Sequence, residues 1–217
     1  MKSRHFLFDL DGTLIDSASS ILECYRLVLD RFALETKLPL ENYLIGPPLG
    51  ATLQLISGVS DKVLLADMTL AFKELYDTVG VKQSLAYAGI DELLHTLHGD
   101  GHKLYIVTNK RIVAARKIID FLGWSAWFEG IYAQDAFTPA LPSKASVIDR
   151  VLDFHHIAQS EALYVGDRNE DGEAAHANGL KFIWVAWGYG DVASMRNARF
   201  DYEIAQSITT LECFSNR

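Results

Sequence analysis

The stretch His5-Phe6-Leu7-Phe8-Asp9-Leu10-Asp11-Gly12-Thr13 decides the fold of this chain, because an apolar run leads directly into a pair of aspartates. Residues 5–8 predict a short buried strand, which ends where Gly12 allows the backbone to turn. Buried strands of this kind are typical of a parallel sheet that helices cover on both faces. In such sheets ligands bind at the carboxyl ends of the strands, where we expect Asp9 and Asp11 to lie.

The segment that follows the first strand, residues 17–86, predicts helices and no strands. Apolar residues recur at helical spacing between residues 17 and 32, and Ser17 is the expected N-cap. Further helical stretches follow at 49–56 and 61–79. We therefore predict that an all-helical insertion separates the first strand from the rest of its sheet.

From residue 87 onward, predicted strands alternate with predicted helices. This order is typical of right-handed βαβ units. The expected fold class is therefore α/β, a Rossmann-like parallel sheet core formed by residues 1–16 and 87–217, with an inserted all-helical cap domain at residues 17–86. The expected strands are 103–107, 131–133, 162–165, 182–185 and 202–204, and the expected helices are 90–97, 111–122, 144–154, 171–177 and 209–214.

Composition and charge narrow the choice of partners. The 217 residues are 49% hydrophobic and 22% charged, which is typical of a globular protein. The 20 basic and 28 acidic residues give a net charge of −8, so the surface field repels polyanions. We therefore expect neither nucleic acid nor an acidic membrane as a partner.

Neither the cysteines nor the N-terminus suggests an exported protein. Cys24 and Cys213 are far apart and lack metal-ligand spacing, so we expect reduced thiols. Asp9 and Asp11 interrupt the N-terminal apolar stretch, which does not fit a signal peptide, and we expect no membrane-spanning segment. The expected location is cytoplasmic.

Asp9 and Asp11 are the strongest candidates for chemistry. Two carboxylates on a turning backbone can converge on one cation, or divide their tasks with one ionised and the other protonated. The structural alternative is a turn that carries a solvated pair of acids. The preceding strand favours a functional pair, since it places both acids at the ligand-binding edge of the sheet.

Further polar residues follow other predicted strands. Thr108, with Asn109 next to it, stands between a strand and a helix, where a hydroxyl and backbone N–H groups can hold an anion. Lys144 occupies the first turn of a helix, a position that the helix dipole disfavours for a cation and that a ligand would explain. Asp167 and Asp171 are four residues apart and can share a hard cation. Taken singly, these residues could also be helix caps and a solvated lysine.

Together the candidate residues suit phosphoryl transfer. That reaction needs a nucleophile held in line and positive charge that neutralises the phosphoryl oxygens. The acids can supply a nucleophile and a hard-cation site, the hydroxyl can bind an anion, and the lysine supplies a fixed charge. Independent caps and surface residues do not explain why such groups gather at successive strand ends.

In its motifs the chain resembles the haloacid dehalogenase (HAD) superfamily, and the resemblance covers essentially the whole chain. The helical insertion resembles the small cap of the C1 type, and several segments are similar to the phosphoglycolate phosphatase-like branch. One departure is Pro142-Ser143-Lys144-Ala145, where many relatives have Gly-Lys-Pro. The motifs that carry the resemblance are Asp9-x-Asp11-Gly12-Thr13, Thr108, Lys144 and Gly166-Asp167-x-x-x-Asp171, and the branch-specific segments are Tyr87-Ala88-Gly89, residues 106–110 and Trp187-Gly188-Tyr189-Gly190.

The resemblance implies a role for each catalytic candidate. Asp9 would be the nucleophile that forms an aspartyl-phosphate. Asp11 would protonate the leaving oxygen and then act as base for the hydrolytic water. Thr108, with Asn109 close by, would bind the transferring phosphoryl group. Lys144 would neutralise that group and the Asp9 carboxylate.

The resemblance also implies a bound Mg²⁺. Its ligands would be Asp9, the backbone carbonyl of Asp11, and Asp167. Asp171 would be either a further ligand or a residue that contacts the ligands without binding the metal.

The function that follows is hydrolysis of a small phosphate monoester that resembles phosphoglycolate. The alternatives are a nucleoside 5'-monophosphate phosphatase, a phosphomutase of the same fold and, least favoured, a non-catalytic phosphate-binding regulator. Asp11 disfavours a dehalogenase, which needs no leaving-group acid. The expected partner is a small phosphorylated metabolite, and the expected state is a monomer or homodimer.

Overall fold

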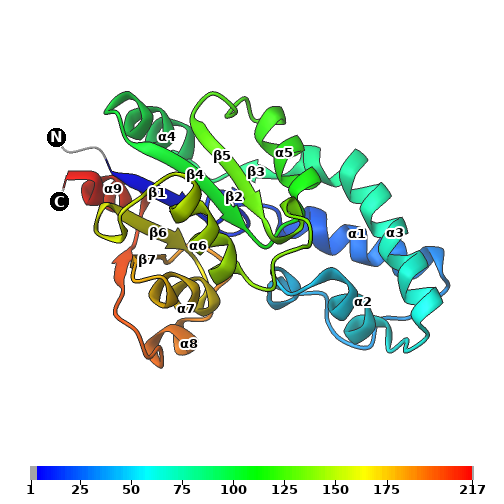
Figure 1. Cartoon of the computed structure of the whole chain (residues 1–217). Coiled ribbons are helices and arrows are strands. Elements are labelled where there is room, and N and C mark those ends of the chain that lie inside the picture. The colour runs from blue at the N-terminus through cyan, green and yellow to red at the C-terminus, as the bar shows by residue number, and fades with distance from the viewer. Residues whose placement is uncertain (1–3, 217) are drawn as a thin grey trace. The chain divides into compact units, whose positions relative to one another are not determined.

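The computed structural model describes residues 4–216, so residues 1–3 and 217 of the predicted core domain lie outside the described residues. The chain forms two compact units, Met1–Asp16 with Ala86–Arg217, and Ser17–Leu85. Figure 1 shows the sheet of the first unit and the helices of the second. The assignment of these units to a core domain and a cap domain stays a prediction.

The first unit is built on a parallel sheet of six strands in the order β5-β4-β1-β6-β7-β8. Strand β1 lies between β4 and β6, with Phe8 paired to Ile106 on one side and to Val165 on the other. The strand order therefore reverses direction at β1, which is where ligands bind in such sheets. The strands are β1 (His5–Phe8), β4 (Lys103–Thr108), β5 (Phe128–Ala133), β6 (Ala162–Gly166), β7 (Lys181–Val185) and β8 (Glu203–Ala205).

Helices cover the sheet, and Figure 1 shows α6 and α7 in front of it. Alternate strand residues, such as Leu7 and Tyr105, pack with Val147 and Ile148 of α6, while their neighbours are also buried. Both faces of the central strands are thus apolar, which confirms the predicted α/β class. The helices of this unit are α4 (Ile90–Gly99), α5 (Ile112–Phe121), α6 (Lys144–Phe154), α7 (Asn169–Ala177), α8 (Val192–Arg196) and α9 (Ile208–Glu212).

The second unit is helical, with α1 (Ala18–Arg31), α2 (Leu49–Ser57) and α3 (Lys62–Thr78). Its core includes aromatic contacts of Phe72 with Tyr25 and Tyr76, at centroid distances of 4.8 and 5.7 Å. Two-residue strands β2 (Ile15–Asp16) and β3 (Leu85–Ala86) lie where the chain passes between units and form a separate sheet. Among residues 4–216, every helix is too short or too polar to cross a membrane.

Most predicted elements are present, and the differences have local causes. Strand β5 begins at Phe128 rather than residue 131, because its first residues pair with β4 through an irregular register at Leu104/Tyr105 that no local pattern reveals. Ser17 precedes α1, but its side chain makes no capping hydrogen bond. The short elements β2, β3 and α8 were not predicted, since they are too short to show a period.

Candidate active site

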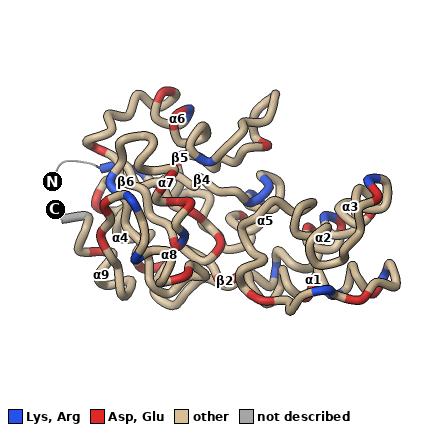
Figure 2. The backbone as a smooth tube through the Cα atoms, turned by 90° about the horizontal axis from the view of Figure 1, so that it is seen from below, with Lys and Arg blue, Asp and Glu red and all other residues tan. Residues whose placement is uncertain are grey.

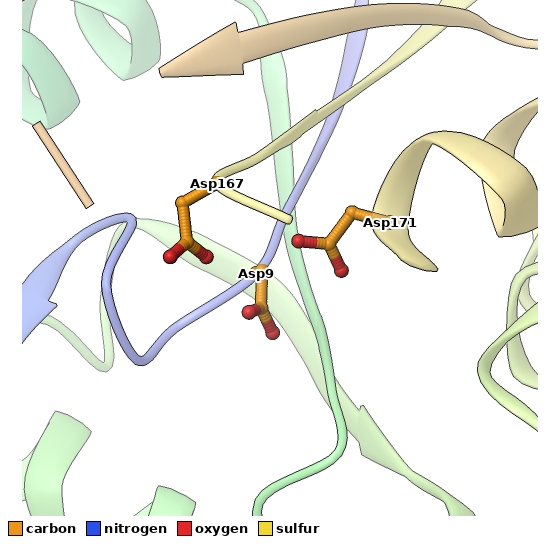
Figure 3. Close-up of side chains that lie close together, drawn as sticks. All are labelled: Asp9, Asp167 and Asp171. Carbon is orange, nitrogen blue, oxygen red and sulfur yellow. The ribbon is translucent and has the colours of Figure 1, made fainter. Parts of the chain in front are cut away.

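Asp9 and Asp167 leave two neighbouring parallel strands, β1 and β6, at the same edge of the sheet. The backbone N–H of Asp9 donates to the carbonyl of Val165 over 2.9 Å, which fixes the two strand ends together. Asp171 lies in the first turn of α7, and its side chain points toward the other two acids (Figure 3). One carboxylate oxygen from each of the three acids lies within 4.8 Å of the others.

Two glycines allow the backbone to approach Asp167 closely. Gly12 has φ +81°, and a Cβ there would meet the Asp167 carboxylate. A Cβ on Gly190 would overlap the backbone carbonyl oxygen of Asp167. The loop after the first strand and residues 187–190 can therefore enclose Asp167 only without side chains at these positions.

Asp167 is fully buried, and several donors hold it in place. The backbone N–H of Tyr189 donates to Oδ2 over 2.7 Å, and the Thr13 hydroxyl donates to Oδ1 over 3.5 Å. The indole of Trp184 donates to the Asp167 carbonyl over 2.8 Å. The sequence did not indicate that Tyr189 and Trp184 support this acid.

Lys144 supplies the positive charge among the acids. It begins α6, where Ser143 caps the helix by accepting the Ser146 N–H over 3.1 Å. Its Nζ lies 3.0 Å from Asp9 Oδ1 and forms a hydrogen-bonded ion pair with Asp171 Oδ1. Burial acts to lower the pKa of the ammonium, but Asp171 and Asp9 outweigh it and hold the pKa well above its ordinary value.

The acids carry more negative charge than Lys144 balances. Burial, with the neighbouring carboxylates, raises the pKa of Asp9 to about 6 and that of Asp167 to about 8. Asp9 Oδ1 is buried, and the Lys144 ammonium lies 3.0 Å from it. Three buried carboxylates with one ammonium among them keep excess negative charge, which suits a hard divalent cation, so this donor set fits a metal site.

Thr108 and Asn109 differ in their surroundings. Thr108 is buried at the end of β4, next to β1, and its hydroxyl accepts the N–H of Lys110 over 3.1 Å. Asn109 is exposed, and its side-chain carbonyl accepts from Gln134 over 3.2 Å. Thr108 therefore shares the edge of the sheet with Asp9, whereas the Asn109 side chain is tied to Gln134.

Comparison with known proteins identifies the family. The model of the haloacid dehalogenase-like hydrolases matches residues 6–185. The chain belongs to this family. The hydrolase is 32% identical to a 5'-nucleotidase of Pseudomonas aeruginosa, over 88% of the chain and 86% of that protein. It is 34% identical to a phosphoglycolate phosphatase of Aquifex aeolicus, over 86% of each chain.

The solved structures agree with the sequence relatives. A crystal structure of a predicted phosphatase from Clostridium acetobutylicum superposes with a TM-score of 0.85, at 27% identity and over 99% of this hydrolase and 98% of that chain. The predicted family, the predicted fold and the predicted enzyme class are confirmed: the protein is a phosphatase of the HAD family. The assignment of roles to individual residues stays a prediction.

The hydrolase also contains an ion pair that the sequence did not indicate. Lys110 Nζ lies 2.8 Å from Asp11 Oδ1, and the two side chains are only 6% and 13% exposed. Lys110 follows Thr108 and Asn109 directly, so its position after a strand end was the available signal. Its pairing with Asp11, on a different loop, depends on the arrangement of the strands.

Proposed function

We propose that this phosphatase hydrolyses a small phosphate monoester of the phosphoglycolate type, with Mg²⁺ bound and with Asp9 as nucleophile. The observation that carries the proposal is the group of buried acids around a single buried lysine at the end of β1. A buried excess of carboxylates is costly unless a cation balances it, so such a group marks a functional site. The similarity to a phosphoglycolate phosphatase supports the substrate class.

The proposed ligands of Mg²⁺ are Asp9, the backbone carbonyl of Asp11, and Asp167. Both oxygens of Asp171 have protein partners, since Oδ1 pairs with Lys144 and Oδ2 accepts the Arg168 N–H over 3.0 Å. We therefore favour Asp171 as a residue that orients Lys144 and supports the site, rather than as a direct ligand. When bound, the metal would supply positive charge to the phosphoryl oxygens.

The reaction proceeds in two displacements. In the first, a carboxylate oxygen of Asp9 attacks phosphorus, and the bond from phosphorus to the ester oxygen breaks while Asp11 donates a proton to that oxygen. In the second, Asp11 accepts a proton from water, the water oxygen attacks phosphorus, and the bond to Asp9 breaks. The products are the free alcohol and inorganic phosphate, and Asp9 is regenerated as a carboxylate.

The remaining predicted residues would bind the transferring group. The Lys144 ammonium lies beside Asp9 and can neutralise charge on both the nucleophile and the phosphoryl oxygens. The Thr108 hydroxyl and the backbone after it can donate to the phosphoryl group, as expected at a strand-to-helix junction. Asn109 would contribute from the rim, where its side chain is exposed.

We propose a cap role for the helical second unit. Cap closure excludes water and favours substrates small enough to be enclosed, which supports a phosphorylated metabolite rather than nucleic acid or a membrane. The net charge of −8 supports the same choice. We also propose a cytoplasmic location and a monomeric or homodimeric state.

The test is release of inorganic phosphate from a panel of metabolite esters, with Mg²⁺ and with chelator, and with Asp9→Asn as the paired blank. Magnesium-dependent release that favours 2-phosphoglycolate would support the proposal. Preference for nucleoside 5'-monophosphates would support the second candidate, which the similarity to a 5'-nucleotidase favours. Turnover of a sugar phosphate without phosphate release would indicate a mutase, and silence across the panel would reject the proposed reaction.

A further inference from the structure

The buried ion pair between Lys110 and Asp11 has no part in the reaction as described above. We propose that Lys110 is the positioning residue of Asp11: its ammonium holds the carboxylate in the orientation that transfers a proton to the leaving oxygen. This inference rests on the proposed function, since it concerns the acid of that reaction. Lys110 would then affect proton transfer through Asp11, and it would not bind the phosphate.

The Lys110 backbone is fixed on both sides. Its N–H donates to the Thr108 hydroxyl over 3.1 Å. Beyond it, the N–H of Ile112 donates to the Asp135 carboxylate over 2.9 Å. The loop that carries Lys110 is thus held to β4 and to the segment after β5, so the backbone from which the Lys110 side chain extends has a defined position.

The backbone of the Asp11 loop is also fixed, but its carboxylate still requires orientation. The N–H of Gly12 donates to the carbonyl of Ile15 over 2.9 Å, and the N–H of Ile15 donates to the carbonyl of Leu10 over 3.1 Å. These bonds hold the main chain. The contact of Nζ with Oδ1 at 2.8 Å restrains the side chain as well, and a carboxylate held by one oxygen presents its second oxygen in a defined direction.

Lys144 and Lys110 contact different acids of the site. Lys144 contacts Asp9 and Asp171, whereas Lys110 contacts Asp11. The acid that would form the covalent bond and the acid that would move the proton therefore have separate ammonium partners. A buried ion pair is weak evidence for stability, because apolar replacements often serve as well, so its presence beside Asp11 favours a role in the reaction.

This assignment has a consequence that depends on the leaving group. An alkoxide is strongly basic and needs a proton as it departs, whereas p-nitrophenolate departs without one. If Lys110 acts through Asp11, its removal must impair the first displacement far more with alkyl phosphates than with p-nitrophenyl phosphate. The second displacement is the same for every ester, so kcat/KM is the quantity to compare. A phosphate-binding lysine would instead affect both esters, because both carry the same phosphoryl group.

The experiment compares wild type, Lys110→Met and Lys110→Arg on 2-phosphoglycolate, p-nitrophenyl phosphate and an alkyl phosphate whose alkyl group carries no charge. We expect Lys110→Met to lower kcat/KM, which reports the first displacement, about 100-fold on both alkyl esters and less than about threefold on the aryl ester. Lys110→Arg should recover part of the loss. Lys103→Met, which breaks an ion pair with Glu129 on the surface, is the matched control and should leave all three rates unchanged.

A second comparison tests whether Lys110 acts through Asp11. In an Asp11→Asn background, Lys110→Met should cause no further loss on the alkyl esters. Equal losses of kcat/KM on alkyl and aryl esters, or independent losses in the double variant, would overturn the inference. So would a loss confined to 2-phosphoglycolate, because Lys110 would then bind the substrate carboxylate. A wild-type enzyme that is inactive on every ester would reject the proposed function itself.

Discussion

The two units of this phosphatase differ in whether charged side chains lie in their interior. In the first unit, charged side chains lie inside the protein, whereas the buried polar side chains of the second unit are all hydroxyls among the described residues. Burial of charge is costly, so a fold retains it only where it is used. The buried charged residues are Asp9, Lys144, Asp167 and Asp171, and the buried hydroxyl residues of the second unit are Ser17, Ser20, Thr52, Ser57 and Ser84.

The charges of the second unit lie on its surface. Figure 2 shows basic and acidic residues along α1 and α3. Arg26 pairs with Glu23 and Asp30 at 2.6 Å each, and all three side chains are about half exposed. Solvent screens such pairs, so they contribute little to stability. The candidate catalytic groups are thus charged residues of the first unit, and variants in each unit test whether the chemistry depends on them.

The largest effect should follow from Asp9→Asn. Loss of the nucleophile should lower kcat by about 10⁴-fold or more, while the fold persists because the amide has the same shape. Initial rates of phosphate release measure the loss, and circular dichroism checks the fold. If a pure preparation of the variant kept activity close to wild type, neither Asp9 nor the buried acids around it would take part in the mechanism.

Asp167→Asn should increase the stability of the metal-free protein and weaken its binding of Mg²⁺. In chelator, replacement of a buried acid by an amide should raise the free energy of unfolding by about 2 kcal/mol. Added Mg²⁺ should stabilise the wild type and no longer stabilise the variant. Denaturant titrations with and without Mg²⁺ measure both effects. If the variant kept the full stabilisation by Mg²⁺, the metal would bind elsewhere.

His102 should make the stability of the first unit depend on pH. Burial lowers the pKa of its imidazole, and Nδ1 accepts the Arg4 N–H over 3.1 Å, so the folded state keeps the ring neutral. Below about pH 6.5 the unfolded chain binds a proton there that the folded chain does not, and the contribution of His102 is lost as pH falls.

His102→Asn is the variant that isolates this effect, because its amide oxygen can still accept from Arg4. The stability advantage of wild type over the variant should shrink between pH 8 and pH 5, as measured by denaturant titration. If the advantage stayed constant over this range, the protonation of the imidazole would not differ between the folded and unfolded states.

The smallest effect should follow from Arg26→Ala in the second unit. Because Arg26 and its partners are exposed, both kcat and the free energy of unfolding should stay within measurement error of wild type. The measurements are the same phosphate assay and denaturant titration. A large loss of activity would contradict the view that the charges of this unit are not part of the chemistry.

The sequence revealed those parts of the site that depend on single strands and helices. Asp9 and Asp167 were predicted because apolar runs point to strand ends, and Lys144 because the first turn of a predicted helix disfavours a cation. The contact of Lys110 with Asp11 and the support of Asp167 by Tyr189 join segments distant in the chain. They depend on strand order and loop geometry, which local patterns do not encode.

The central claim is that a phosphoryl group is transferred to Asp9. The most direct test is to quench turnover with acid and search the peptides by mass spectrometry for the added mass of one phosphoryl group. The account predicts a modification at Asp9 that appears only with substrate and is absent from Asp9→Asn. Turnover with no modified peptide at any time, or with the phosphoryl group on another residue, would contradict it.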